Sequence, residues 1–311
     1  MKNHVLVFAT SSLLLFANAC APSSPQTPTD SAPATPVALT PETTPQKPAP
    51  EVPQTETQPA PTPPQATPKT NAPRPKPLTE TTPIVEPVVA EESSEKVAKP
   101  DHAAWNDLLK KYVSTDGKVN YKGFKQDMPA LEAYLNELTS HPIQSDWSRT
   151  EKMAYWINAY NAFTIKLILD NYPLKSIIAL DNGKTWDVKR VQLGDKTYSL
   201  NGIENDILRP QYKDARIHFA VNCAAKSCPP LLNRAWTGDN LSKYLDQQAK
   251  AFINNSKYNK ISADAVQISK IFEWYAADFG DIIAYLNKYS NVKINPSATV
   301  TYIEYDWALN E

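Results

Sequence analysis

Cysteine and glycine are scarce in this chain, which has three and seven residues of these types among 311. Residues 21–100 contain no glycine, aromatic residue or cysteine, which excludes a packed core from that stretch. The two downstream cysteines are not spaced C-x-x-C, which excludes the usual motif of thiol oxidoreductases. A net charge of −1 gives no electrostatic footprint for nucleic acid.

The N-terminus reads as an export signal. A positively charged start is followed by the largely apolar run Val5–Ala17, which is too short to span a bilayer as a helix. Ala17-Asn18-Ala19 is a secretory cleavage pattern, and the next residue, Cys20, stands where bacterial lipoproteins receive lipid. We expect a signal peptide over 1–19 and an exported protein, membrane-anchored through Cys20, facing the periplasm or the surface of the bacterial cell envelope. The alternative is a secreted protein with an unpaired thiol.

The segment over 20–100 is predicted to be a disordered linker rich in Pro, Thr and Ser. It carries 21 prolines between Ala21 and Pro100, which favour extended polyproline-II stretches. At ~3.1 Å per residue it would reach at most about 250 Å, a spacer that holds a domain away from a membrane. A PxxP ligand for a partner is the alternative function.

Residues 101–311 hold every tryptophan, tyrosine and glycine, and are predicted to form one α+β domain, a largely antiparallel sheet packed with helices. Ser148-Arg149-Thr150-Glu151 fits a capping box that starts an apolar helix running to about Asp170. Other elements are expected as helices over 129–138, 239–254 and 281–289, a hairpin over 188–200, one or two strands over 260–271, and a last strand over 300–305.

The apolar, partly β-branched run Arg216–Asn222 is predicted to be a buried strand that leads into Cys223 and Cys228. On a regular strand His218 faces opposite Cys223, which leaves Cys228 as the better thiol partner of the histidine. Because neighbouring thiols in an oxidising compartment usually pair, we predict a Cys223–Cys228 disulfide. A reactive thiol, a metal ligand pair and inert reduced cysteines remain alternatives; with one histidine nearby, no metal centre or cofactor is predicted.

Polar residues beside this run complete the candidate site. His218 in an apolar setting needs a polar partner, and Glu204 is the candidate; pairing would raise the pKa of the histidine. Asn158 and Asn161 share a face of an apolar helix, and bond a neighbouring backbone or line a binding site. Asp306 is a candidate binding residue or anchor for Arg216, whereas Asp278 is read as a cap or turn residue. His218, Cys228, Cys223 and Glu204 are the candidate catalytic residues.

A composite of motifs resembles the family called domain of unknown function 547 and covers roughly Trp105–Asn310. The residues that carry it are Trp156-x-Asn158-x-Tyr160-Asn161-Ala162, Leu200-Asn201-x-Ile203-Glu204, Arg216–Ala220 with Cys223 and Ser227-Cys228-Pro229, and Tyr305-Asp306-Trp307-x-Leu309-Asn310. The resemblance implies a fold unit and an order of motifs, not a reaction. A more distant likeness is to papain-like and transglutaminase-like enzymes, from which this chain departs because the Asn158–Asn161 helix has no cysteine.

Two functions follow as expectations. The first is an uncharacterised lipid-anchored envelope protein whose domain acts in binding or assembly, with a protein or peptidoglycan partner that the sequence does not identify. The second is a thiol-dependent hydrolase or transferase on a peptide-like envelope substrate, with His218 as base. A redox module that cycles the cysteine pair is a third.

Overall fold

The computed structural model describes residues 98–311, which include the predicted domain 101–311. The predictions for the signal peptide, Cys20 and nearly all of the linker lie outside the described residues. The helices of the described part are α1 (Ala103–Tyr112), α2 (Tyr121–Phe124), α3 (Met128–Ser140), α4 (Arg149–Asp170), α5 (Arg209–Tyr212), α6 (Leu241–Ile253), α7 (Ile271–Trp274), α8 (Ala276–Phe279) and α9 (Ile282–Tyr289). Short 3₁₀ segments span Lys125–Asp127, Ile177–Ala179, Asp181–Gly183 and Ala215–Phe219, and a π-helix spans Gly202–Leu208.

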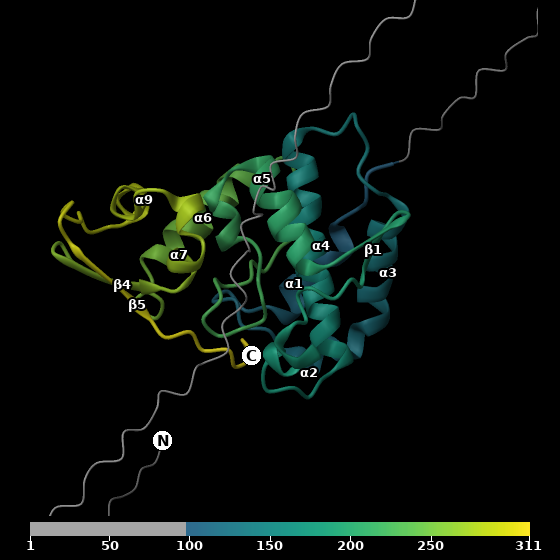
Figure 1. Ribbon diagram of the computed structural model, residues 1–311. Helices are drawn as coiled ribbons and strands as arrows, with labels where there is room; N and C mark the ends of the chain where they lie inside the picture. Colours follow the sequence, from purple (N-terminus) through teal and green to yellow (C-terminus); the bar gives the residue numbers. More distant parts are fainter. Residues whose placement is uncertain (1–97) are drawn as a thin grey trace, which may run out of the picture. The chain divides into compact units, whose positions relative to one another are not determined.

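Helix α4 is the centre of the core. Its capping box forms as predicted: the Ser148 side chain accepts from the Glu151 N–H, and the Glu151 side chain accepts from the Ser148 N–H. The helix buries side chains on nearly every face, as expected of an apolar helix surrounded by other elements. Figure 1 shows α1 and α3 on one side of the described residues, α7, α9, β4 and β5 on the other, and α5 and α6 between.

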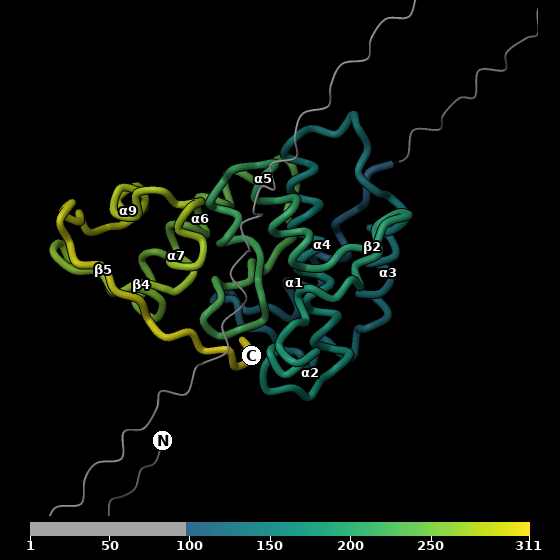
Figure 2. Tube along the Cα trace, in the orientation of Figure 1, coloured from purple at the N-terminus to yellow at the C-terminus, as the bar shows by residue number. Residues whose placement is uncertain are grey.

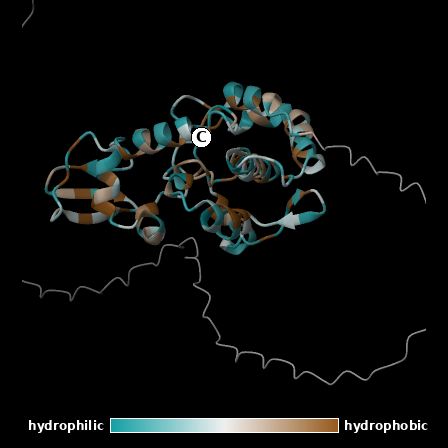
Figure 3. Ribbon diagram, turned by 90° about the horizontal axis from the view of Figure 1, so that it is seen from above, coloured by the Kyte–Doolittle hydropathy of each residue, from teal (hydrophilic) through white to brown (hydrophobic). Residues whose placement is uncertain are grey.

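The strands form two small sheets, so the predicted α+β class is confirmed. β1 (Val191–Leu193) and β2 (Lys196–Tyr198) make the predicted hairpin around Gly194. The second sheet has the order β3 (Lys260–Ile261), β4 (Ala265–Ser269), β5 (Thr299–Ile303). Its β3–β4 pair is antiparallel, but β4 and β5 are parallel, because helices α7 to α9 lie between them in the chain and supply the crossover that a parallel pair needs. In Figure 3 brown, apolar residues gather on this sheet.

The predicted strand Arg216–Asn222 is wrong. Residues Ala215–Phe219 form a 3₁₀ turn instead, closed by local bonds such as Ala220 N–H to the Ile217 carbonyl at 2.9 Å. Asp214 starts the turn, since its carboxylate accepts from the Arg216 N–H at 3.0 Å. The run is apolar because it is buried under neighbouring elements, and periodicity cannot separate a short buried strand from a buried helical turn.

After β5 the chain turns back toward the helices, as the yellow trace in Figure 2 shows. Residues 305–310, here called the C-terminal segment, run beside the cysteine loop, residues 222–228. The Lys226 N–H donates to the Ala308 carbonyl at 2.7 Å, and the Asn310 N–H donates to the Ala224 carbonyl at 3.1 Å. The Val119 N–H donates to the Asn310 carbonyl at 2.8 Å from the other side. The C-terminal segment therefore ties the cysteine loop to the helical part of the fold.

Gly117 allows a turn to approach the end of the cysteine loop. It has φ +81°, and a Cβ there would lie 2.4 Å from Cβ of Pro230. We expect Gly117→Ala to lower the free energy of unfolding by roughly 2–4 kcal/mol, from left-handed strain and overpacking together. Gly183→Ala is the control, since Gly183 has the same φ and its Cβ would meet only a carbonyl at 3.9 Å. Equal urea midpoints for the two variants would contradict the packing argument.

Candidate functional site

The cysteine loop brings two buried sulfurs into contact. Ala224, a non-glycine residue with φ +62°, reverses the chain directly after Cys223. The Cys223 S–H then donates to Cys228 Sγ at 2.9 Å, and the Cys223 N–H donates to the same sulfur at 2.9 Å. Both residues are thiols in the structure, so the predicted disulfide is not formed in it.

Buried amides hold this loop in place. Asn161 of α4 donates to the Ala220 carbonyl at 2.9 Å and accepts from the Asn222 N–H at 2.8 Å. Asn222 in turn bridges the loop, donating to the Pro229 carbonyl at 2.8 Å and accepting from the Ala224 N–H at 2.9 Å. Asn158 makes the equivalent pair of bonds to the backbone of Trp236, at 2.7 and 3.0 Å. Both predicted asparagines thus satisfy neighbouring backbone, and Asn161 positions the segment that precedes Cys223.

The sulfur of Cys228 accepts two hydrogen bonds from Cys223, and its surroundings act on the pKa of its thiol in opposite directions. Burial raises the pKa of its thiol well above the ordinary value, and the neighbouring Cys223 thiol adds to the rise. The Cys223 N–H and the Tyr305 hydroxyl act in the opposite direction and favour the thiolate. In the closed site burial dominates and Cys228 is protonated, while its donors are already in place for a thiolate once water reaches it.

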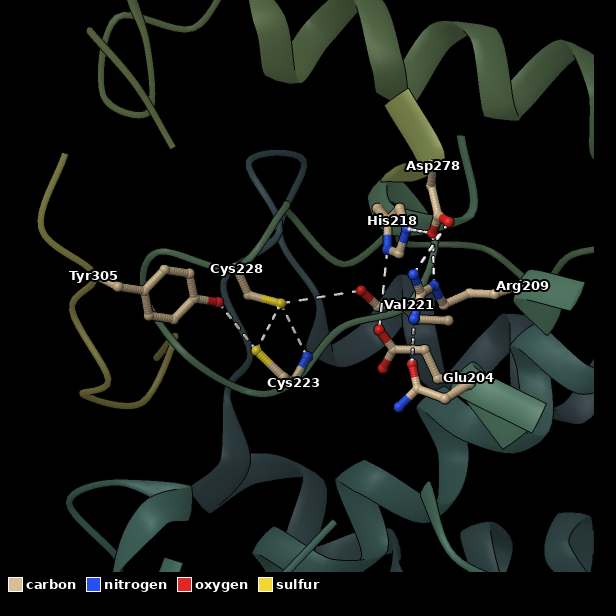
Figure 4. A network of polar contacts seen from close by, with 9 residues as sticks. Glu204, Arg209, His218, Val221, Cys223, Cys228, Asp278 and Tyr305 are labelled. Carbon is tan, nitrogen blue, oxygen red and sulfur yellow. Dashed lines mark hydrogen bonds and ion pairs between the residues drawn. The ribbon is translucent and has the colours of Figure 1, made fainter. Parts of the chain in front are cut away.

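His218 is oriented by Asp278, at the end of the network in Figure 4. Its Nε2 lies 2.8 Å from Asp278 Oδ2, and Arg209 holds the same carboxylate through Nε at 2.6 Å and Nη2 at 3.1 Å. Burial would raise the pKa of Asp278, but hydrogen bonds from His218 and Arg209 outweigh it and the pKa falls below its usual range. An ionised carboxylate only accepts, so Nε2 carries the proton and Nδ1 is the basic nitrogen.

Nδ1 of His218 faces Glu204. The two groups are 3.9 Å apart (Nδ1 to Oε1), and Nδ1 makes no hydrogen bond among residues 98–311. Glu204 is buried on the π-helix Gly202–Leu208, an element that is rare and frequent at functional sites. The predicted proximity of Glu204 and His218 is therefore present. The expected rise in the histidine pKa is not: burial lowers it, against the opposing hydrogen bond from Asp278.

The candidate catalytic residues converge on one cavity of about 30 Å³. It is lined by Tyr160, Glu204, His218, Val221, Cys223, Cys228, Pro229, Ile271, Trp274, Tyr275 and Tyr305. The opposed faces predicted for His218 and Cys223 do not exist, because the strand that would impose them is a 3₁₀ turn. A volume of this size has room for one or two water molecules but not for a peptide.

A second cavity, of about 220 Å³, reaches Cys228 from the outside and is here called the outer cavity. It shares Cys228 with the inner one, and its wall includes Lys118, Lys226, Lys257, Asn222, Tyr258, Asp116 and Glu311. Cys228 therefore lies between the small cavity that His218 lines and the larger outer cavity.

Asp306 does not join this site. It is exposed, its carboxylate accepts from the Ala308 N–H at 2.9 Å, and its backbone pairs with Ser227. The predicted anchoring of Arg216 by Asp306 is wrong, since Arg216 pairs with Asp214 and Asp246 at 2.6 and 2.8 Å. The carboxylate that sequence reasoning missed is Asp278. Its position just before Gly280 reads equally well as a turn, and nothing nearby in the sequence marks it as the partner of His218.

Within residues 98–311 no three His, Cys, Asp or Glu side chains are grouped closely enough to hold a metal ion. Nor does any helix in this part combine the length and apolar character needed to cross a membrane.

Fold and site together define an α+β domain with a buried histidine–carboxylate pair beside a pair of thiols. Residues 144–253 match the family described as "Protein of unknown function, DUF547", which supports the resemblance that the motifs indicated. The matched region contains α4, Glu204, His218 and both cysteines, but not Asp278 or Tyr305. No curated protein and no solved structure matches the chain.

Proposed function

We propose that this is a lipid-anchored cell-envelope protein. The support is in the sequence: an apolar leader, Cys20 directly after Ala19, and a proline-rich spacer before the folded domain. Lipid at Cys20 would hold the protein in a membrane, and the spacer would set how far its domain reaches from the bilayer.

The anchor is tested by Cys20→Ala. Expressed with its own leader in a bacterium and fed a labelled fatty acid, the wild-type chain is expected to carry label and sediment with membranes, because a diacylated cysteine anchors stably. The Cys20→Ala chain should lose the label and appear in the soluble fraction. Asn18→Ala, which brings the leader closer to the lipoprotein pattern, is the control and should keep both properties. An unlabelled wild-type chain, or a Cys20→Ala chain still held by membranes, contradicts the anchor.

For the folded domain we propose thiol-dependent acyl transfer or hydrolysis on a peptide-like substrate, with Cys228 as nucleophile. The observation that carries this is the convergence of Cys228 and the basic Nδ1 of His218 on one cavity. The Cys228 sulfur would attack a substrate carbonyl and form a thioester while the C–N bond breaks. His218 would take the thiol proton and give it to the leaving amine, and water or a second amine would then take the acyl group.

The small volume of the inner cavity limits how a substrate could approach Cys228. A peptide has no room in about 30 Å³, so its carbonyl would approach Cys228 from the outer cavity while His218 stays on the inner side. Asp278 would act through His218, as a positioning residue that keeps the proton on Nε2 and stabilises the imidazolium.

The test uses a peptidyl acyloxymethyl ketone, an electrophile that needs an activated cysteine, alongside iodoacetamide, which reports only on exposed thiolate. We expect the ketone to label Cys228, and His218→Gln to slow this labelling by about 100-fold or more, because glutamine cannot accept the proton. His102→Gln is the control: His102 is partly buried and bonds Tyr134 at 2.8 Å, away from the cysteines. Equal ketone labelling of wild type and His218→Gln contradicts catalysis.

Binding without catalysis is the second candidate. It is favoured by the burial of both thiols and by a surface groove of about 510 Å³ whose wall includes Lys110, Lys118 and Lys122. Lysines suit an anionic envelope polymer. Absence of ketone labelling, together with salt-sensitive binding to such a polymer that Lys122→Glu weakens, would favour this function.

A further inference from the structure

Cys223 and Cys228 have the geometry of two thiols that can form a disulfide with each other. The sulfurs are 2.9 Å apart, five residues separate them in sequence, and no side chain has to leave the space between them. A disulfide bond is shorter, about 2.05 Å, so closure needs an approach of less than 1 Å.

The two cysteines are buried to the same degree but line different cavities. Cys228 lines the outer cavity, whereas Cys223 lines only the inner one among these two. A reagent from solution therefore meets Cys228 first, and Cys223 is placed to resolve whatever forms on it. Three lysines, Lys118, Lys226 and Lys257, face two carboxylates, Asp116 and Glu311, around that opening. This excess of positive side chains favours a reagent that carries carboxylates.

Closure would also act on the C-terminal segment. The Tyr305 hydroxyl lies 3.1 Å from Cys223 Sγ and donates to it, because the Cys223 proton is directed to Cys228. Ser227, next to Cys228, bonds Asp306 through its hydroxyl at 2.8 Å and its N–H at 3.2 Å. The C-terminal segment thus contacts one sulfur directly, through Tyr305, and the residue next to the other, through Asp306.

We propose that Cys223 and Cys228 form a reversible disulfide by exchange with anionic low-molecular-weight disulfides that enter the outer cavity, and that its closure loosens the C-terminal segment. The Cys228 thiol gives up its proton and its sulfur attacks one sulfur of the reagent, which forms a mixed disulfide with Cys228; the reagent's S–S bond breaks, and its other half leaves with the proton as a thiol. Cys223 then attacks Cys228 Sγ, and the second half of the reagent leaves as a thiol. The pair loses two electrons and two protons in total, and the reagent gains both.

This switch would also remove the nucleophile of the proposed acyl transfer, although the exchange itself does not depend on that reaction. Closure draws Cys223 Sγ toward Cys228, so the bond that this sulfur accepts from the Tyr305 hydroxyl weakens and the C-terminal segment is held less firmly on oxidation.

The experiment uses the full chain with Cys20→Ser, which leaves the pair as its only thiols. Oxidised glutathione, anionic, is compared with cystamine, the cationic disulfide of similar chemistry. We expect glutathione to give an intramolecular disulfide that dithiothreitol reverses, about tenfold faster than cystamine at low salt, with the difference shrinking as salt rises. Lys226→Gln with Lys257→Gln should remove most of the preference, and Lys250→Gln, an exposed lysine outside the cavity, should leave it.

Single variants assign the order of attack. Cys223→Ser should stop at a mixed disulfide on Cys228, and Cys228→Ser should react at least about tenfold more slowly. Amide hydrogen exchange in residues 305–310 should quicken in the oxidised chain and recover on reduction. Three results would each overturn the proposal. The thiols could remain open to alkylation after prolonged treatment with the oxidant, Cys223 could react faster than Cys228, or the amide exchange rates in residues 305–310 could stay unchanged on oxidation. Disulfide formation without ketone labelling would leave the switch standing and remove only the catalytic function.

Discussion

Asp278→Asn is expected to lower the free energy of unfolding by about 3–5 kcal/mol at neutral pH. The carboxylate accepts from His218 Nε2 and, through two bonds, from Arg209, whose side chain is only 15% exposed. Asparagine has the same shape as aspartate but no negative charge, so the partly desolvated guanidinium of Arg209 would lose its counter-charge. Urea denaturation of the two chains measures the difference.

The control lies three residues on. Asp281 caps α9 by accepting from the Ala284 N–H at 3.0 Å, and asparagine caps a helix as well as aspartate does. Asp281→Asn removes the same charge from the same turn and should change stability by less than about 0.5 kcal/mol. If both variants are equally stable, the contacts of Asp278 with His218 and Arg209 add no more to the free energy of unfolding than a surface carboxylate does.

The pH dependence of the same variant has a definite sign. The folded-state pKa of Asp278 lies below its unfolded value, so its contribution is present above about pH 4, the unfolded pKa, and is lost as pH falls through the lower folded value. The folded-state pKa of His218 is lowered by burial, so the unfolded chain takes up its proton first and stability also falls as pH drops below about 6.5. The Asp278→Asn chain should lack the fall in stability that Asp278 causes below about pH 4 and keep the one that His218 causes below about pH 6.5. Urea midpoints measured from pH 7 to pH 3 would show the difference.

Local sequence signals predicted the elements that local physics decides. Ser148 and Glu151 predicted the start of α4 because a capping box needs only four residues. The turn between β1 and β2 was predicted in the same way, from Gly194 between two short strand-like runs. The parallel pairing of β4 with β5 was not predicted, since it depends on where the intervening helices pack.

The site was predicted in its residue types but not in its geometry. His218, Glu204 and the two cysteines were selected because polar or reactive groups in apolar surroundings need partners. Their arrangement was missed because Arg216–Asn222 bonds within itself rather than to a strand. Asp278 was missed for a different reason: it meets His218 across 60 residues of chain, and a carboxylate before a glycine is indistinguishable from a turn residue until the fold is known.

The sharpest test of how the cysteine loop is held is Asn161→Ala. The change removes both bonds to the backbone of Ala220 and Asn222 and leaves a buried carbonyl and a buried N–H without partners. We expect a loss of roughly 2–4 kcal/mol in the free energy of unfolding, from two unsatisfied buried groups. Because the segment that leads into Cys223 is released, alkylation of the two thiols by iodoacetamide should also become faster under native conditions.

Asn158→Ala is its matched partner on the same helix. Asn158 makes the same two kinds of bond, to the carbonyl and N–H of Trp236, so its loss should cost a similar free energy. Trp236 is not part of the cysteine loop, so thiol alkylation in Asn158→Ala should rise only as far as global unfolding allows. At a urea concentration where both variants are equally folded, alkylation at least about tenfold faster in Asn161→Ala would assign to Asn161 the positioning of the cysteine loop. Equal rates would mean that the loop is held by its other contacts, those of Asn222 and of the C-terminal segment, and that α4 contributes only to the core.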